Sequence, residues 1–238
     1  MAAEKTPSEE VSPIFASLFP KSTNLDAYGM LLDDIAAFEA AGHKRDDVGS
    51  LATYGYIEYR GVRELLAIAA SKLTDRPEDS EPLERLAAGY SFLDLGSGDG
   101  RAVISAACLC PTLSEAVGVE LSPSRHALAL KNHRKLPEEM QRFVRFVEGD
   151  ILKDTSGLIA AADIIYLANL RFPDEIVAAV NEYLINLLGR SKPVVLATLR
   201  EIALPCPHEA WTLDLPMSWN KDGWPVFFYL VRGPSGST

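Results

Sequence analysis

The sequence predicts an α/β protein with a Rossmann-like, doubly wound, mostly parallel seven-stranded sheet, a C-terminal antiparallel hairpin and an N-terminal helical subdomain. From Ser91 to Leu199, short apolar runs alternate with segments of helical periodicity, which is typical of repeated strand–helix units. The runs are almost wholly apolar, so we expect helices to cover both faces of the sheet. Beyond Leu204, two strand-like runs follow one another with no helical pattern between them, which predicts the hairpin.

Before the sheet, the apolar spacing predicts two amphipathic helices, at residues 25–41 and 59–73. A turn-like segment at 53–56 separates them. The charged, proline-bearing segment 75–80 is expected to link them to a short helix that ends near Gly89.

The elements of the sheet follow in a regular order. We expect strands at 91–95, 116–120, 143–147, 163–168, 193–199, 209–215 and 225–232, and helices that begin near Arg101, Pro123 and Pro173. The loop inside the hairpin is expected to contain Trp219, Gly223 and Trp224.

The chain of 238 residues is long enough for one core with a modest appendage. We therefore divide it into a disordered tail (1–13), the helical subdomain (14–88), the core domain (89–232) and a flexible tail (233–238).

Composition narrows the classes of partner. The chain holds 23 Lys and Arg against 33 Asp and Glu, a formal charge of −10, which repels polyanions and favours a basic partner. We expect no direct nucleic-acid binding, and no membrane span, because no run approaches the roughly 20 apolar residues that a bilayer requires. The oligomeric state stays open.

Three cysteines, an odd number, suit reduced thiols and an intracellular location, cytoplasmic or nuclear. The four histidines are scattered, and Cys108 with Cys110 lacks a second pair, so we expect no metal site.

The most specific motif is DLGSGDG at Asp94–Gly100, which follows an expected strand and opens a helix. Glycines permit a sharp turn and close approach of the backbone to a ligand, and the first turn of the helix presents free N–H groups to an anion. The dinucleotide fingerprint would need Gly or Ala at Arg101. A purely structural glycine turn is the weaker alternative.

Two further acids end expected strands. Glu120 lies about 20 residues past the glycine turn, where a carboxylate accepts from ribose hydroxyls. Asp150 is placed to accept from an exocyclic amine, with Ile151 packing on the ring, although a lone Asp at a strand end is also a common helix cap.

The D-x-G-x-G-x-G spacing resembles the first motif of class I S-adenosylmethionine-dependent methyltransferases. This resemblance implies that S-adenosyl-L-methionine is the cofactor and that Asp94 accepts from its amino group. Across the whole chain, the expected cofactor-binding residues are Tyr54, Gly55, Asp94, Gly96, Ser97, Gly98, Gly100, Glu120, Asp150, Ile151 and Asn169.

Three segments resemble the disruptor-of-telomeric-silencing family of non-SET histone lysine methyltransferases: TYG at 53–55, ANLRF at 168–172, and the hairpin with SW at 218–219 and PVFFY at 225–229. The resemblance implies that Tyr54 and Gly55 cover the methionine end of the cofactor and that aromatic residues line a lysine channel. The implied catalytic residues are Asn169, Phe172, Trp219, Phe228 and Tyr229.

The chain also departs from that family's pattern. Ala168 replaces the first Asn of a pair, Phe228 replaces a channel Tyr, and two extra residues separate Trp219 from Pro225. No lysine-rich tail is present to hold nucleosomal DNA. We therefore expect a lysine on a free histone or another basic protein as the acceptor.

Three alternatives stay open from the sequence. The enzyme could methylate a small molecule, or the domain could bind cofactor or partner without turnover. The aromatic residues of the expected channel could instead be ordinary hydrophobic core, where large aromatics are common.

Overall fold

The computed structural model describes residues 11–20, 27–44, 55–153, 155–188, 192–204 and 208–232, with side chains from residue 34 onward in the second of these ranges. Residues 1–10 of the expected tail at 1–13, the expected tail at 233–238 and Tyr54 lie outside these ranges. Helix α1 begins at Pro13, at the boundary of the expected N-terminal tail.

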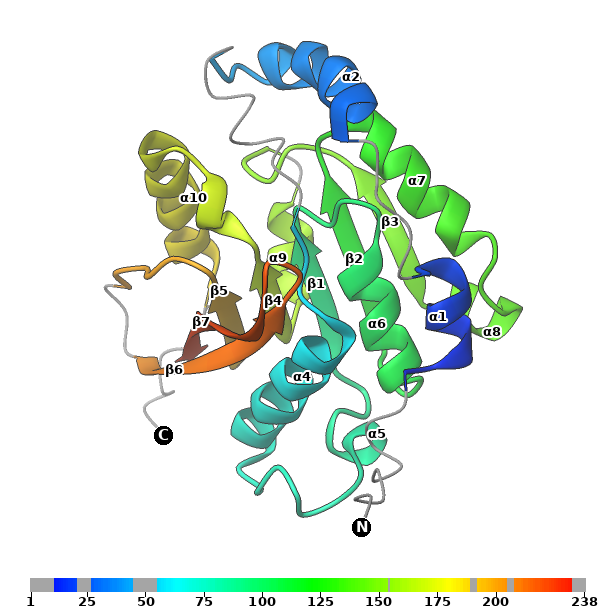
Figure 1. The fold of residues 1–238 in the computed structure, drawn as a ribbon. Helices are drawn as coiled ribbons and strands as arrows, with labels where there is room; N and C mark the ends of the chain where they lie inside the picture. The colour runs from blue at the N-terminus through cyan, green and yellow to red at the C-terminus, as the bar shows by residue number, and fades with distance from the viewer. Residues whose placement is uncertain are drawn as a thin grey trace.

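The described strands form one seven-stranded sheet in the order β3-β2-β1-β4-β5-β7-β6 (Figure 1). The pairs from β3 to β5 are parallel, and β7 runs antiparallel to both β5 and β6. The fold class predicted from the alternating apolar runs is therefore confirmed. The strands are β1 (Ser91–Leu95), β2 (Glu115–Glu120), β3 (Val144–Glu148), β4 (Ile164–Leu167), β5 (Val194–Thr198), β6 (His208–Met217) and β7 (Asn220–Val231).

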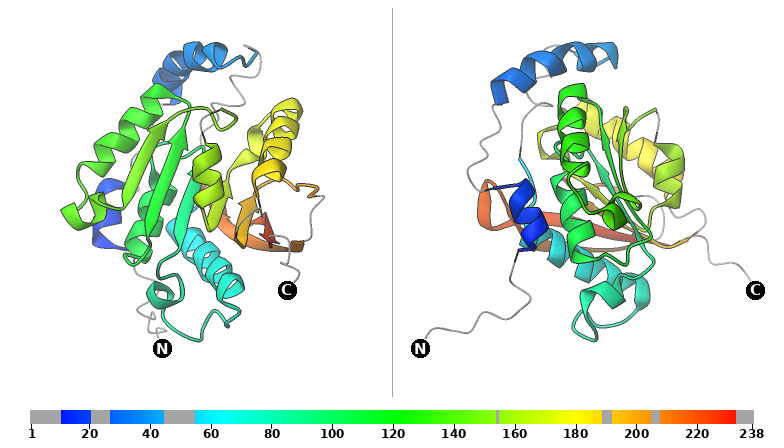
Figure 2. Two further views of the ribbon diagram at one scale, coloured as in Figure 1. Left: turned by 180° about the vertical axis from the view of Figure 1, so that it is seen from behind. Right: turned by 90° about the vertical axis from the view of Figure 1, so that its right-hand side faces the viewer.

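Helices cover both faces of this sheet (Figure 2). One apolar cluster joins a face of the sheet to α1, α4, α5, α6, α7 and α8, and a second joins the opposite face to α9 and α10. The helices are α1 (Pro13–Leu18), α2 (Ala27–Ala40), α4 (Tyr59–Thr74), α5 (Leu83–Leu86), α6 (Arg101–Leu109), α7 (Pro123–His133), α8 (Glu138–Gln141), α9 (Ser156–Ala161) and α10 (Asp174–Leu187). The short helices α1, α8 and α9 were not expected from the sequence.

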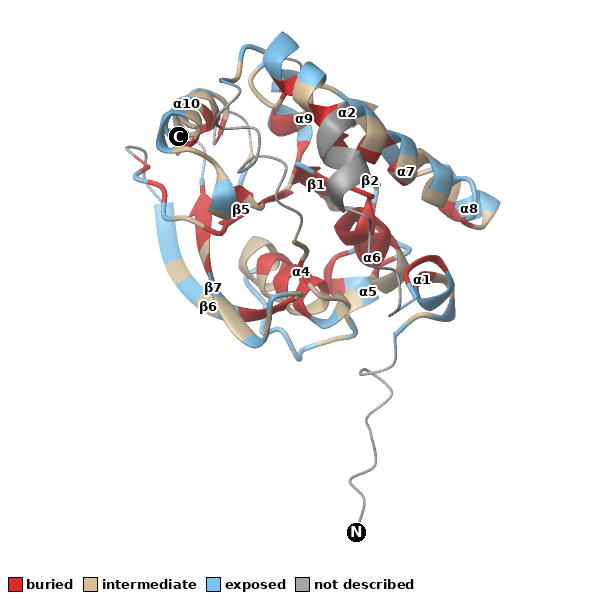
Figure 3. Cartoon of the chain, turned by 45° about the horizontal axis from the view of Figure 1, so that its top comes forward, coloured by how far each residue is buried: buried red, intermediate tan, exposed pale blue. Residues whose placement is uncertain are grey.

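Of the helices before the sheet, α4 packs directly on strands, whereas α1 and α2 pack on helices that flank the sheet. Helix α4 contacts α6, β5 and β6, α1 contacts α6, and α2 contacts α7. Figure 3 shows the buried residues gathered on the strands and on the helix sides that face them. Helices α1, α4 and α5 thus share their hydrophobic core with the sheet, whereas Phe38 of α2 belongs to a separate small cluster.

Strand β1 lies at the point where the order of parallel strands reverses, with β2 on one side and β4 on the other. Asp94 is in register with Gly118 of β2 and Tyr166 of β4. Doubly wound sheets bind ligands at this switch point, outside the carboxyl ends of the strands.

The hairpin differs from the expectation in its loop. Gly223 and Trp224, expected in a loop, belong to β7, which starts at Asn220. Ser218 and Trp219 form the turn, because Met217 pairs with Asn220 across it, and the register shifts between Leu215 and Met217. Backbone pairing overrides the polar composition of the start of β7. No helix in the described ranges is long and apolar enough to span a bilayer.

Candidate functional site

A cavity of about 410 Å³ opens at the carboxyl ends of the parallel strands. This volume is typical of a small-molecule site. Ten residues named from the sequence lie on its wall: Gly55, Asp94, Gly96, Ser97, Gly98, Glu120, Asp150, Ile151, Phe172 and Trp219.

The glycine turn joins β1 to α6 at one end of the cavity. Gly96 and Ser97 donate their N–H groups to Val119 O at 2.8 and 2.9 Å, and Gly98 N donates to Glu120 Oε2 at 2.7 Å. Three glycines of the turn have positive φ, at 94° for Gly96, 55° for Gly98 and 84° for Gly100. Because L side chains rarely adopt this conformation, the turn depends on glycine.

Gly100 has a different role from the one expected. It lies off the cavity wall, and a Cβ at this position would lie 2.5 Å from the ring of Phe146. The residue therefore lets α6 approach β3 closely instead of approaching a ligand.

Buried carboxylates gather beside the turn. Asp94, Asp99 and Glu120 are all buried, and burial, followed by the charges of Glu120 and Asp99, raises the pKa of Asp94 to about 8. Burial likewise raises the pKa of Glu120, and the nearby Arg125 opposes this effect. Asp94 Oδ1 has no hydrogen-bond partner among the described residues, so the site fits a ligand that brings positive charge or N–H donors.

Tyr166 is a wall residue that the sequence reasoning missed. It is buried, its hydroxyl has no hydrogen-bond partner in the described chain, and burial together with the Asp94 carboxylate raises its pKa. Its place in the apolar run of β4 concealed it, and only the register that pairs it with Asp94 would have revealed it.

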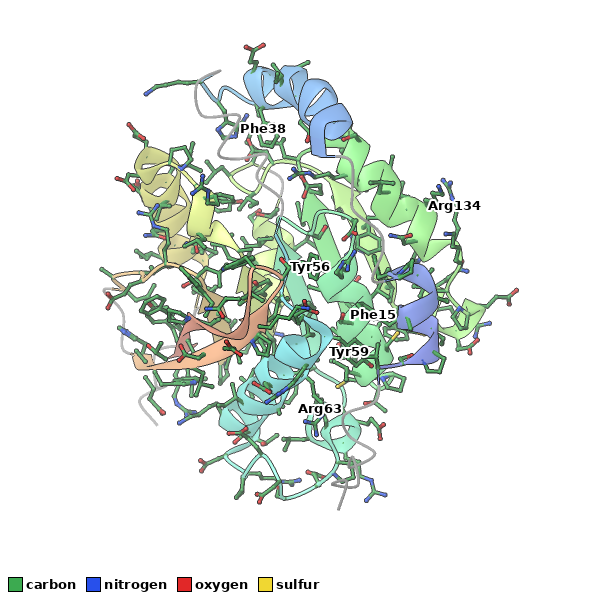
Figure 4. The ribbon with its side chains drawn as sticks, in the orientation of Figure 1. Phe15, Phe38, Tyr56, Tyr59, Arg63 and Arg134 are labelled. Carbon is green, nitrogen blue, oxygen red and sulfur yellow. The ribbon has the colours of Figure 1, made fainter. Side chains whose placement is uncertain are left out.

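Arg101, a second missed residue, is held between two rings. Its guanidinium lies 4.4 Å from the centroid of Phe19 and 4.0 Å from that of Tyr56, and it forms an ion pair with Asp99 at 3.3 Å. Cation–π contacts of this kind are worth up to about 2 kcal/mol when desolvated. Arg101 therefore ties α1 and the segment at residue 56 to the first turn of α6, and Figure 4 shows Tyr56 close to the centre of the molecule.

The segment at 55–58, with Gly55, Tyr56 and Ile57 on the cavity wall, joins the hairpin turn. Ser218 N donates to Tyr56 O at 2.9 Å, Glu58 N donates to Pro216 O at 2.9 Å, and Tyr56 N donates to Ser218 Oγ at 3.1 Å. A Cβ on Gly55 would lie 2.7 Å from the ring of Trp219. Gly55 thus permits the indole of Trp219 to pack on the 55–58 segment, although the two are far apart in the sequence.

Trp219 lies where the cavity meets the surface. Its side chain is 42% exposed and packs edge-on against Trp224, with ring centroids 6.2 Å apart. Trp224 and Tyr56 also line the cavity.

The structure places Phe228 and Tyr229 away from the cavity, contrary to the expected channel. Phe228 is fully buried and stacks on Trp211 at 5.4 Å, on the α4 side of the sheet. Tyr229 belongs to the cluster on the other face, where its hydroxyl accepts from Ile202 N at 2.7 Å. Successive residues of a strand point to opposite faces, so these two neighbours could not line one channel.

Asn169 also differs from its expected role. Its Oδ1 accepts from Leu199 N at 3.0 Å and Arg200 N at 2.9 Å, which joins the end of β4 to the end of β5. Its side chain is buried off the cavity wall, although Nδ2 has no hydrogen-bond partner in the described chain. Its neighbours Ala168, Leu170 and Arg171 line the cavity instead.

At the end of β3, Asp150 is both a wall residue and a local cap. Its Oδ1 accepts from Leu152 N at 2.9 Å, and Lys153 lies 3.1 Å from Oδ2. Ile151 lines the cavity next to it, and Phe172 packs against Phe38 and Ile176 at the same end. Among the described residues, no group of three His, Cys, Asp or Glu side chains could hold a metal ion.

Comparison with known proteins gives a family and a fold. The family model described as histone methylation protein DOT1 matches residues 84–205, just over half of the chain. The matched range includes the glycine turn and the 168–172 segment, and it stops before the hairpin. No curated protein matches the sequence.

Two solved structures show the same fold at low identity. Cofactor-bound Rv0187 from MTB is 18% identical with a TM-score of 0.50, and the match covers 94% of this chain and 100% of that one. The methyltransferase domain of bacterial CtHen1 is 14% identical with a TM-score of 0.50, covering 72% of this chain and 98% of that one.

Proposed function

The chain belongs to the family described as histone methylation protein DOT1, within the class I S-adenosylmethionine-dependent methyltransferases, and on that premise we propose that it methylates the side-chain amine of a lysine in a basic protein. The observation that carries the proposal is one cavity that runs from the buried carboxylate of Asp94 to the exposed indole of Trp219.

The carboxylate end of the cavity suits S-adenosyl-L-methionine. Asp94 would accept from the amino group, the N-terminus of α6 would face the carboxylate, Glu120 would hold the ribose and Asp150 the adenine amine. The cofactor supplies an already activated methyl group on a sulfonium. The protein's own contribution is then to place the acceptor in line with that methyl, a proximity effect.

The aromatic end suits a long-chain amine. Tyr56, Trp219 and Trp224 line it. A free lysine amine has a pKa of about 10.4, and a mostly apolar wall that strips water disfavours the ammonium and exposes the lone pair. These side chains would bind the aliphatic stem and exclude water.

The test uses cofactor labelled in its methyl group, offered separately with free histones, nucleosomes and a metabolite extract. We expect label on lysine in free histones, with less on nucleosomes because the acidic chain repels DNA. Glu120→Ala serves as the cofactor-site control and should strongly reduce labelling in every sample.

Two outcomes would contradict the proposal. Label confined to small molecules would favour a metabolite acceptor. Tight binding of cofactor with no S-adenosylhomocysteine released on any lysine-bearing protein would favour a binding domain without turnover.

A further inference from the structure

Helix α2 lies across the carboxyl ends of β1 and β2, where the adenosine half of the proposed cofactor site is found (Figure 1). Phe38 of α2 and His43 beyond its end line the same cavity as Glu120 and Ile151. Neither residue has a role in the site as described so far.

Phe38 is placed as a wall of that subsite. Its side chain is 5% exposed and packs with Leu121, Phe172 and Ile176. Leu121 directly follows Glu120, the proposed ribose-binding residue. Figure 4 shows Phe38 on the side of α2 that faces the strand ends.

A buried carboxylate one turn earlier ties α2 to the segment behind Glu120. Asp34 is fully buried, and its Oδ1 accepts from Ser122 Oγ and, at 2.9 Å, from Ser124 Oγ. Its Oδ2 lies 3.6 Å from Arg125 Nε. A buried carboxylate is costly unless it is paired, and all of these partners come from the start of α7.

Ser122 connects Asp34 to the ribose end of the site. Its backbone N–H donates to Glu120 Oε1 at 2.9 Å, while its hydroxyl caps α7 by accepting from Arg125 N at 3.2 Å. The position of Ser122, and hence of its N–H, is therefore held partly by α2.

Ala41, the residue that follows α2, contacts a neighbour of the second carboxylate of the subsite. Lys153 donates to Ala41 O at 2.9 Å and lies 3.1 Å from Asp150 Oδ2. Helix α2 and the residue that follows it thus contact the neighbours of both Glu120 and Asp150.

We propose that α2 is part of the adenosine subsite, in which Phe38 contacts the adenine ring opposite Ile151 and Asp34 is a positioning residue that orients Glu120 through Ser122. This inference rests on the proposed cofactor site. It adds a binding residue and a positioning residue that lie outside the range matched by the family model.

The first experiment measures calorimetric affinity for S-adenosylhomocysteine and for adenosine. Phe38→Ala should weaken both by about tenfold, the size of one base–aromatic contact, and Phe38→Leu should weaken them less. The matched control is Phe228→Leu, because Phe228 is an equally buried aromatic off the cavity. It should lower thermal stability without changing either affinity.

The second experiment is a double-mutant cycle between Asp34 and Glu120. Asp34→Ala should weaken S-adenosylhomocysteine binding by about fivefold, within the range of directly coupled residues, and Asp34→Asn should restore part of it because its amide oxygen still accepts from Ser122. In a Glu120→Ala background, where no side-chain oxygen remains to accept from Ser122 N, Asp34→Ala should have little further effect. A merely structural role for Asp34 would instead give additive losses.

The outcomes separate this inference from the proposed function. If the wild-type protein binds no adenosyl ligand, the cofactor site itself is wrong. If the wild type binds but Phe38→Ala and Phe38→Leu bind equally well, or the cycle is additive, the cofactor site stands and the role of α2 is overturned.

Discussion

At the scale of single residues, the site concentrates negative charge where the fold removes water. Asp94 sits beside Glu120 and Asp99, all buried, and its pKa rises to about 8. Such an arrangement disfavours the ligand-free state and favours a ligand with an ammonium group. Glycines 96, 98 and 100 permit the backbone path that brings these acids together.

Asp94 should make cofactor binding depend on pH. A ligand ammonium favours ionised Asp94, so the affinity of the wild type should rise as pH rises toward about 8 and then level off. Asp94→Asn should weaken binding by about 1–3 kcal/mol at pH 8.5. Calorimetry with S-adenosylhomocysteine at pH 6 and pH 8.5 measures both. Because the ligand titrates identically in both proteins, an equal pH dependence in the variant would exclude Asp94 as the cause.

The same residue should oppose stability in the ligand-free protein. The folded-state pKa of about 8 exceeds the value of about 3.9 expected in the unfolded chain. The folded state thus binds more protons between these values, and the free energy of unfolding falls as pH rises through the window. In thermal melts, the Tm of Asp94→Asn should rise relative to the Tm of the wild type as pH increases from about 4 to 8. A constant difference would contradict the raised pKa.

Gly100→Ala should destabilise the fold by about 1–3 kcal/mol, because Ala would be held at positive φ and its Cβ would meet Phe146. Gly157→Ala is the matched control, since a Cβ there meets nothing within 4 Å and the residue lies in helix α9. Chemical denaturation measures both. Equal effects in the two variants would refute the close-packing role of Gly100.

At the scale of elements, the C-terminal hairpin has two separate functions. Its turn, with Trp219, pairs with the 55–58 segment at the mouth of the cavity. Its strands close the sheet, with Phe228 and Tyr229 buried on opposite faces. The sequence of the hairpin resembles that of the family's channel-lining hairpin, but here the hairpin contributes to the cavity through its turn and the nearby Trp224.

Two variants of the hairpin should separate these functions. Tyr229→Phe leaves the buried Ile202 N–H without its acceptor and should lower the free energy of unfolding by about 1–3 kcal/mol with unchanged cofactor affinity. Trp219→Ala removes a partly exposed ring and should lower kcat/KM for the protein acceptor with little change in stability. Denaturation and steady-state kinetics on both variants provide the measurement. Loss of cofactor binding in Tyr229→Phe would instead indicate that Tyr229 belongs to the binding site.

At the scale of the whole molecule, the formal charge of −10 affects association with the acceptor protein more than the transfer of the methyl group. A field of this sign attracts basic proteins over a range of about 8 Å at physiological ionic strength. It supports the choice of a basic acceptor without selecting a particular lysine.

The KM for a basic protein acceptor should therefore rise as salt is added, while the KM for a neutral peptide with a single lysine should change little. Initial rates between about 50 and 300 mM salt give the comparison, because added salt shortens the distance over which exposed charges attract one another. Equal salt dependence of KM for the two acceptors would show that the net charge of the protein does not attract the basic acceptor.

Local features of the sequence were enough to predict much of the fold and of the candidate site. The apolar runs placed the strands, because a strand buried on both faces needs apolar residues throughout. The glycine spacing predicted the turn with Asp94, and the strand ends predicted Glu120 and Asp150. Seven residues of this group lie on the cavity wall, and so do Gly55, Phe172 and Trp219, which were named from the family resemblance.

Tertiary structure alone decided the remainder, since it depends on which distant surfaces meet. The face of β7 to which Phe228 and Tyr229 each point, the partners of Asn169 at the end of β5, and the packing of Gly55 under Trp219 all require strand register and docking. The same is true of Tyr166 beside Asp94 and of Phe38 on α2. Periodicity predicts that a residue is buried, and only the assembled fold determines what it is buried against.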